Sequence, residues 1–133
     1  MSEENVEIVR RTWEGLGDAN PSWLDLYDEA CEIRNPPEFP ARGPFVGHAG
    51  VRQWRTEIWE VFSELRHEVT DLIDLDDRDA VLTIQRTVGR MRHTGLPVNV
   101  EWASVFTLRE GKVFRAQGYS TRAEALEAAG LSE

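Results

Sequence analysis

The sequence predicts an α+β fold in which helices pack on one face of a curved, mostly antiparallel sheet. Apolar residues recur with helical spacing in the first part of the chain, and strand-type alternation follows in the second part. A short helical pattern comes last. Helices and strands that are separated along the sequence in this way are typical of α+β domains. The 133 residues have the size of one domain, so we expect a single domain over residues 1–133.

Three helices are expected before the sheet. Ser2 can cap the first, and an apolar stripe follows at three- and four-residue steps: Val6, Val9, Trp13 and Leu16. Asn20-Pro21 is a capping residue followed by proline at the first helical position, which predicts a second, short helix. The third helix is expected over residues 47–63. The spacing of its Trp54 and Trp59 does not allow both to point directly inward.

Three segments around the third helix are not expected to be helical. A short strand is expected over residues 31–35. Residues 36–47 hold four of the six prolines and predict an ordered surface loop. Residues 66–75 fit neither strict alternation nor a helix, so we expect a strand with a bulge there.

The second part of the chain predicts the main strands and a final helix. A long strand over residues 80–92 leads by a turn into a hairpin over residues 98–120. Gly111 can supply the positive φ that the tight turn of this hairpin needs. Thr121 with Glu124 forms a capping box, which starts a helix that we expect to end at Gly130.

Composition limits the classes of partner. Fifteen basic and twenty-four acidic residues give a formal charge of -9, which argues against nucleic acid or an anionic membrane as a partner. No apolar run reaches the roughly 20 residues of a membrane span. The one cysteine, Cys31, allows no disulfide within the chain, and we interpret it as a small core residue of a cytoplasmic protein.

The titratable residues give little indication of metal or cofactor chemistry. His48, His67 and His93 are interpreted as surface or capping residues, with His48 and His93 held in reserve as bases at a pocket mouth. The aspartates at 74, 76, 77 and 79 lack the glycine and glutamate of a calcium loop and predict a solvated turn. No helical histidine pair is present, so we expect neither a metal nor a cofactor.

Five segments spread over the chain carry a family resemblance: VEIVRRTWEGL, the strand end Asn35-Pro36, GHAGVRQW, VFTLREGKV and TRAEALEAAGL. Together they resemble the nuclear transport factor 2-like superfamily, in its SnoaL-like polyketide cyclase branch. The resemblance implies a cone-shaped, strongly curved sheet with the three N-terminal helices over its concave face and a short C-terminal helix. It implies little about activity, because this fold hosts several unrelated functions.

The resemblance also implies that Ser104 points into the cone, and strand alternation then selects the other inward residues. On the next strand the inward set includes Gly89, and on the last strand it includes Phe114 and Ala116. For Trp54, Trp102 and Phe106, core packing and pocket lining remain open alternatives. The expected ligand-binding residues are Trp13, Ile33, Asn35, Trp54, Gln85, Thr87, Met91, Trp102, Ser104, Phe106 and Gly118.

The residues at the family's catalytic positions differ from those of its enzymes. The general-base aspartate of the ketosteroid isomerases corresponds to Asn35, whose amide cannot take up a proton, and their second acid corresponds to Ser104. The acid and base network of the limonene-type epoxide hydrolases falls on Thr87, Gly89 and Gly118. Related sequences carry bulky or acidic residues where this chain has Ala116 and Gly118, which implies free space at those positions.

Three functions are therefore carried forward. The first is a binding domain for a small, mainly apolar ligand, in which the usual catalytic acids are not present. The second is an isomerase or cyclase acting by acid-base chemistry on a cyclic ketone or polyketide-like substrate, with Asn35, Ser104 and His48 as candidate catalytic residues. The third is a structural module that forms a homodimer through the convex sheet face around Val105 and Thr107.

Overall fold

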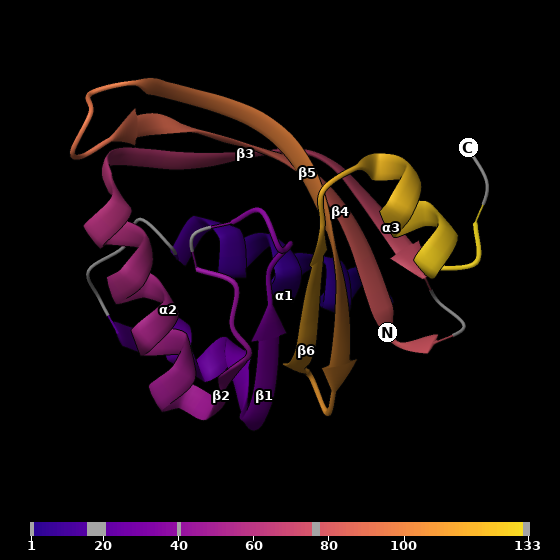
Figure 1. Ribbon diagram of the computed structural model, residues 1–133. Coiled ribbons are helices and arrows are strands. Elements are labelled where there is room, and N and C mark those ends of the chain that lie inside the picture. The colour runs from indigo at the N-terminus through magenta and orange to yellow at the C-terminus, as the bar shows by residue number, and fades with distance from the viewer. Residues whose placement is uncertain (1, 16–20, 40, 76–77, 132–133) are drawn as a thin grey trace.

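The computed structural model describes residues 2–15, 21–39, 41–75 and 78–131, and Figure 1 shows a curved sheet with helices on both sides. Leu16 of the expected apolar stripe, the expected cap Asn20 and the turn residues Asp76 and Asp77 lie outside the described residues. The helices are α1 (Ser2–Gly15), the 3-10 helix η1 (Pro21–Leu26), α2 (Gly47–Val61) and α3 (Arg122–Ala128). The strands are β1 (Tyr27–Arg34), β2 (Phe45–Val46), β3 (Phe62–Leu75), β4 (Ala80–Met91), β5 (Pro97–Arg109) and β6 (Lys112–Tyr119).

The six strands form one open, mixed sheet in the order β2-β1-β6-β5-β4-β3. The pair β1–β6 is parallel and every other neighbouring pair is antiparallel. In Figure 1, α1 and α2 lie on the concave side of this sheet, and α3 lies on its outer side. The predicted α+β class and the mostly antiparallel sheet are therefore confirmed.

Several element boundaries differ from the sequence-based expectation. The first strand begins at Tyr27, four residues before the expected start, and the second helix is a 3-10 helix. The proline-rich loop contains the two-residue strand β2, which pairs with β1 through Phe45 and Ile33. The third helix ends at Val61, because the chain turns directly into β3 there.

The bulge expected in the irregular strand is confirmed. The register between β3 and β4 shifts between Val69 and Asp71, and it shifts again near the start of β3. Gly111 has a φ of 76°, as the tight turn between β5 and β6 requires. Thr121 and Glu124 form the expected capping box at the start of α3.

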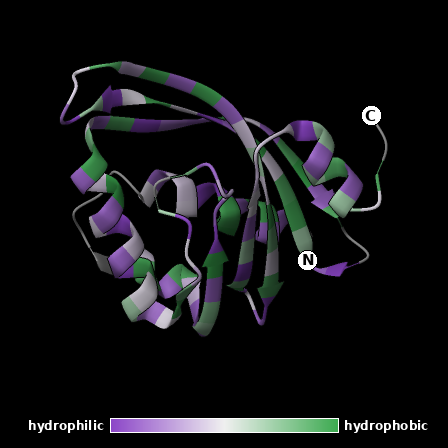
Figure 2. Ribbon diagram, viewed as in Figure 1, coloured by the Kyte–Doolittle hydropathy of each residue, from purple (hydrophilic) through white to green (hydrophobic). Residues whose placement is uncertain are grey.

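The sheet separates two apolar cores, and the bands of hydrophobic residues along its strands are visible in Figure 2. The larger core lies between the concave face and helices α1 and α2, and it contains Val9, Trp54 and Phe106. The smaller core lies under α3, where Ala103 and Ile84 meet Leu126. Ala103 therefore faces away from the cone, as predicted, but it is fully buried there.

One inward assignment, that of Phe114, is wrong. The register between β5 and β6 shifts between Thr107 and Leu108, so Leu108 pairs with Val113. The bulge reverses the alternation: Val113 is buried in the main core, and Phe114 is half-buried and carries the Arg109 guanidinium 3.9 Å from its ring centre.

The joint between α2 and the sheet is held by Arg92. Its guanidinium donates hydrogen bonds to the carbonyl oxygens of Trp59 (2.7 Å) and Phe62 (3.0 Å). The carbonyls at a helix C-terminus have no partners within the helix and carry partial negative charge, so a cation stabilises them. This contact places the end of α2 against the end of β4.

No helix in the described part of the chain has the length and apolar character needed to cross a membrane.

Candidate functional site

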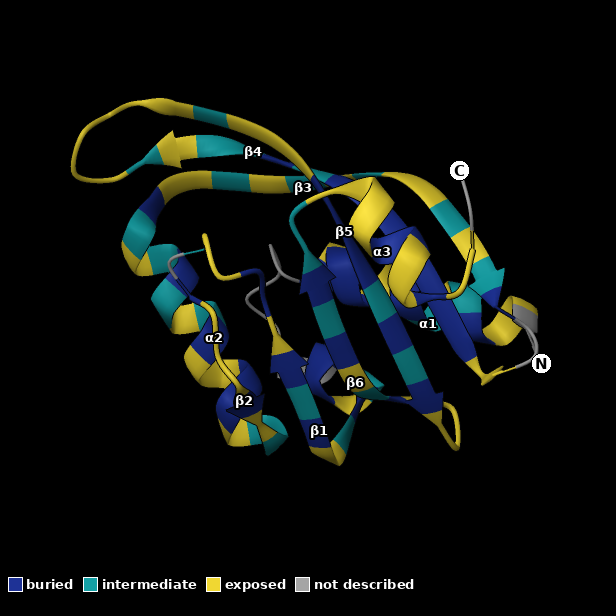
Figure 3. Ribbon diagram, turned by 45° about the vertical axis from the view of Figure 1, so that its right-hand side comes forward, coloured by how far each residue is buried: buried dark blue, intermediate teal, exposed yellow. Residues whose placement is uncertain are grey.

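The concave side of the sheet presents mostly the residues that alternation selects. Trp102, Ser104 and Phe106 of β5 are buried there, as are Thr83, Gln85 and Thr87 of β4. Figure 3 shows this buried middle of the sheet in dark blue, while the far end of the β4–β5 hairpin is exposed. The interior therefore has two ends that differ in how they are filled.

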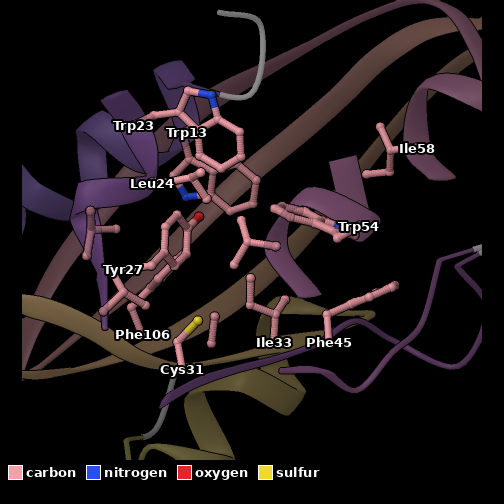
Figure 4. Close-up of a cluster of buried hydrophobic side chains, with 14 of the residues drawn as sticks. Trp13, Trp23, Leu24, Tyr27, Cys31, Ile33, Phe45, Trp54, Ile58 and Phe106 are labelled. Carbon is pink, nitrogen blue, oxygen red and sulfur yellow. The ribbon is translucent and has the colours of Figure 1, made fainter. Parts of the chain in front are cut away.

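Aromatic side chains fill the deep end of the interior. The Trp13 ring lies edge-on to Trp102 and to Phe106, with ring centres 5.6 Å and 5.8 Å apart. Figure 4 shows Tyr27 and Ile33 of β1 and Trp54 of α2 around the rings of Trp13 and Phe106. The space left among them is about 10 Å³, which does not accommodate a ligand.

The free space that the resemblance implied at Gly118 is occupied. A Cβ atom at Gly118 would lie 2.8 Å from the Trp102 ring and 2.8 Å from Pro36 Cδ. Ala116, its neighbour on the same face, is buried in the main core. The small residues of β6 therefore admit the indole of Trp102, and they leave no cavity for a ligand.

The open space lies instead at the outer end of the cone, where a cavity of about 370 Å³ is present. Its walls come from the loop before β2, the end of α2, and strands β3, β4 and β5. Most of the lining is apolar, and Trp102 forms its inner wall. The described lining residues are Glu38, Phe39, Ala41, Ile58, Phe62, Leu65, His67, Thr87, Met91, Val98, Val100, Glu101, Trp102 and Ser120.

His67 forms part of the wall of this cavity, although sequence reasoning placed it at the surface. It lies opposite Thr87 in the β3–β4 register, and its ring centre is 4.9 Å from that of Trp13. Burial lowers the pKa of His67 to about 4, so the ring is neutral at pH 7. The alternation of Leu65, His67 and Val69 along β3 was the signal that could have placed it inward.

A chain of hydrogen bonds connects the cavity wall to the sheet. Trp102 Nε1 donates to Thr87 Oγ1 at 2.8 Å, and Thr87 Oγ1 lies 3.0 Å from His67 Nδ1. His67 Nε2 is buried and has no hydrogen-bond partner among the described residues. One wall of the cavity thus carries a neutral imidazole with an unused nitrogen.

Several other polar side chains of the interior are hydrogen-bonded within the chain, whereas the indole nitrogens of Trp13 and Trp54 are buried without a partner among the described residues. Thr83 Oγ1 donates to Gln85 Oε1 at 2.6 Å, and Gln85 Nε2 donates to Ser104 Oγ at 3.1 Å. Asn35 Nδ2 donates to the carbonyl of Ala41 at 2.6 Å and so holds the loop before β2. Partners within the chain use these groups, which is the usual state of buried polar side chains.

The three candidate catalytic residues are not brought together at the cavity. Asn35 and Ser104 border the filled space, and His48 lies at the start of α2, where its Nε2 is 2.8 Å from the carbonyl oxygen of Tyr27. That contact fixes the imidazole to the backbone. The other reserve base, His93, is exposed in the turn between β4 and β5.

The expected ligand-binding residues divide between the two ends. Thr87, Met91 and Trp102 line the open cavity. Gln85 lines neither space and is fully buried in the polar network. The others surround the filled end: Trp13, Ile33, Asn35, Trp54, Ser104, Phe106 and Gly118, with Trp102 shared.

The site offers no recognisable centre for a metal. Within the described ranges, no three His, Cys, Asp or Glu side chains gather closely enough to hold an ion. Cys31 is fully buried, and burial raises the pKa of its thiol, so it is a poor nucleophile. The arrangement suits binding by shape and hydrogen bonding better than metal or thiol chemistry.

Comparison with known proteins identifies the sequence family. A model of the SnoaL-like domain matches residues 9–116. A search of curated proteins finds no match. The match covers the second half of α1, all of α2 and most of the sheet.

Solved structures share the fold. Bal32a, from a soil-derived mobile gene cassette, is 20% identical with a TM-score of 0.79, covering 96% of each chain. TerC, co-crystallised with polyporic acid, is 19% identical with a TM-score of 0.76, covering 96% of this chain and 98% of its own. A ketosteroid isomerase-like protein from Catenulispora acidiphila, in complex with trimethylamine, is 17% identical with a TM-score of 0.74, covering 94% of this chain and 93% of its own.

Substitution of Gly118 tests whether Trp102 closes the deep end of the cone. Gly118→Ala should lower the free energy of unfolding by about 1–3 kcal/mol, because the added methyl group meets the indole and Pro36. Urea denaturation measures the effect. Arg115→Ala, at an exposed residue of the same strand, is the control and should change little. A Gly118→Ala protein as stable as the wild type would show that the ring does not occupy this position.

The burial of His67 predicts a pH-dependent stability. The folded state disfavours the protonated ring, whose pKa is lowered from 6.5 to about 4, whereas the unfolded chain protonates near 6.5. The contribution of the neutral His67 ring to the free energy of unfolding is therefore complete above pH 6.5. About 1–3 kcal/mol of this free energy is lost as the pH falls to about 4.

The measurement is urea denaturation at several pH values between 4 and 7.5 on the wild type and on His67→Phe. The variant should lose less stability than the wild type over this range. His93→Gln removes an exposed histidine and serves as the control, which should follow the wild type. If the free energy of unfolding depended on pH in the same way for the wild type and His67→Phe, the lowered pKa of His67 would be contradicted.

Proposed function

The chain belongs to the SnoaL-like domain family of the nuclear transport factor 2-like superfamily, and we propose that it binds a small, largely apolar molecule in its open cavity. The proposal depends on one observation above all: the cavity of about 370 Å³ has a mainly apolar lining and few polar groups. Cavities of this size and composition are typical of small-molecule sites. The family includes small-molecule-binding, isomerase and cyclase domains, so the proposal is consistent with it.

Neighbouring structures support the idea of a small ligand. TerC was crystallised with polyporic acid, and the Catenulispora protein was crystallised with trimethylamine. Those ligands belong to those proteins, whose identity with this chain is below one fifth. These neighbours support only the general proposal that this fold encloses a small molecule, and they do not identify the ligand of this chain.

Isomerase or cyclase activity has less support than binding. Proton abstraction needs a base, and the amide of Asn35 and the hydroxyl of Ser104 are not bases at neutral pH. Both groups also hydrogen-bond within the chain. The binding function requires no such group, so we favour it over the enzymatic alternative.

A bulky residue at the cavity mouth tests the proposed site. Val100 lines the cavity and is 44% exposed, so Val100→Trp should fill the space without disturbing the core. Ile73→Trp, at a partly exposed position on β3 that is not a lining residue, is the matched control. A panel of uncharged bicyclic hydrocarbons and ketones serves as the probe, and calorimetry and thermal shift measure binding.

We expect at least one probe to bind the wild type and the control with similar affinity, and Val100→Trp to weaken it about tenfold or more, a loss of about 1.4 kcal/mol. Equal binding by all three proteins would place the ligand elsewhere. Absence of binding across the panel at millimolar concentration would argue against the proposed function.

We also propose that two copies associate through the convex face of the sheet. Thr107, Gln117 and Tyr119 are half-buried on that face, and burial raises the pKa of the Tyr119 hydroxyl. Partly covered residues of this kind suit a self-complementary interface on a two-fold axis. Homodimerisation would leave the cavity walls unaltered, because the lining residues lie elsewhere.

Sedimentation tests the dimer. The wild type should sediment as a dimer at micromolar concentration, and Thr107→Lys should shift it towards the monomer, because dimerisation would then bury a second cation beside Arg115 in the proposed interface. Arg66→Lys, on the distant edge strand β3, is the control and should leave the dimer intact. A monomeric wild type would refute the interface.

A further inference from the structure

We infer that His67 is the residue that orients the ligand in the cavity, by donating a hydrogen bond from Nε2 to an acceptor oxygen on an otherwise apolar, uncharged molecule. The inference rests on the proposed binding function and adds to it the chemistry of the ligand. His67 is a half-buried residue of the central part of β3 that lines the open cavity.

The hydrogen-bond chain assigns the proton on the imidazole. An indole N–H can only donate, so Thr87 Oγ1 accepts from Trp102 at 2.8 Å. The Thr87 hydroxyl has no other hydrogen-bond partner among the described residues, so its proton is assigned to His67 Nδ1, which lies 3.0 Å away. Because Nδ1 accepts this bond, the single proton of the neutral ring is on Nε2.

That proton has no acceptor within the described chain. His67 Nε2 is buried and unpartnered, and an unsatisfied buried donor is unfavourable. The ring is also held in place, since it packs 4.9 Å from Trp13 and 6.4 Å from Trp102 between ring centres. A ligand that brings an acceptor beside the ring would recover the missing hydrogen bond.

The other polar side chains of the cavity wall are less available. Thr87 is engaged with Trp102 and His67, and Ser120 donates to Glu38. Glu101 is exposed at the rim. The lining thus includes two carboxylates and, among the described residues, no lysine or arginine, which disfavours an anionic ligand. A neutral molecule with one acceptor oxygen fits this set of groups.

A matched pair of probes tests the inference. 1-Tetralone and tetralin have the same fused-ring framework, and only the ketone carries an acceptor. We expect the wild type to bind 1-tetralone about tenfold more tightly than tetralin, the value of one hydrogen bond worth about 1.4 kcal/mol. His67→Phe should bind the two equally, and His67→Gln, whose amide can donate, should keep part of the preference.

His93→Gln removes an exposed histidine that does not line the cavity, and it should keep the preference. Nitrogen NMR of the wild-type imidazole gives a second readout that does not depend on a variant's folding: it should show the proton on Nε2, with a shift when 1-tetralone is added but not when tetralin is added. A proton on Nδ1 would overturn the inference.

The outcomes also separate this inference from the proposed function. Equal binding of both probes to the wild type, or a preference that survives in His67→Phe, would refute the role of His67 and leave the cavity as a binding site. Binding of neither probe at millimolar concentration would count against both.

Discussion

The position of the Trp102 indole determines how the interior of this protein is divided. Its ring packs over Gly118, meets Trp13 edge-on at 5.6 Å, and lies 4.4 Å from Phe39 between ring centres. One side of the indole belongs to the filled end of the cone, and the other is a wall of the open cavity. The two alternatives of core packing and pocket lining therefore both hold for this residue, whereas Phe106 and Trp54 border only the filled end.

Because of this division, the polar groups at the family's catalytic positions lie away from the open cavity. Ser104 and Asn35 lie around the filled end. Ser104 accepts a hydrogen bond from Gln85, and Asn35 donates one to the carbonyl of Ala41. A buried polar group needs such a partner, since leaving it unpaired costs about 1–3 kcal/mol. The same principle makes the unpartnered nitrogen of His67 informative, because His67 is a lining residue of the open cavity.

Much of the fold followed from sequence pattern, but the location of the cavity did not. Period-two alternation selects a face, so the inward positions of Trp102, Ser104 and Phe106 were predictable. Alternation does not measure volume, and the small residue at Gly118 suggested free space that a ring from the neighbouring strand fills. The inward assignment of Phe114 failed for a related reason, since a single bulge reverses the faces of a strand and leaves no clear sequence signal.

The dimensions of the open cavity depend on the joint at its outer edge. Ile58 and Phe62 of the wall flank the end of α2, and Phe62 pairs in the sheet register with Met91, which immediately precedes Arg92. Because the guanidinium of Arg92 bonds the carbonyls of Trp59 and Phe62, a charged, multidentate contact holds the end of α2 against the β3–β4 strand pair. A pocket with walls fixed in this way selects ligands by shape more strictly than one between mobile loops, since little binding energy goes into ordering the protein. The same restraint would let a single hydrogen bond from one wall decide which of two similar ligands is preferred.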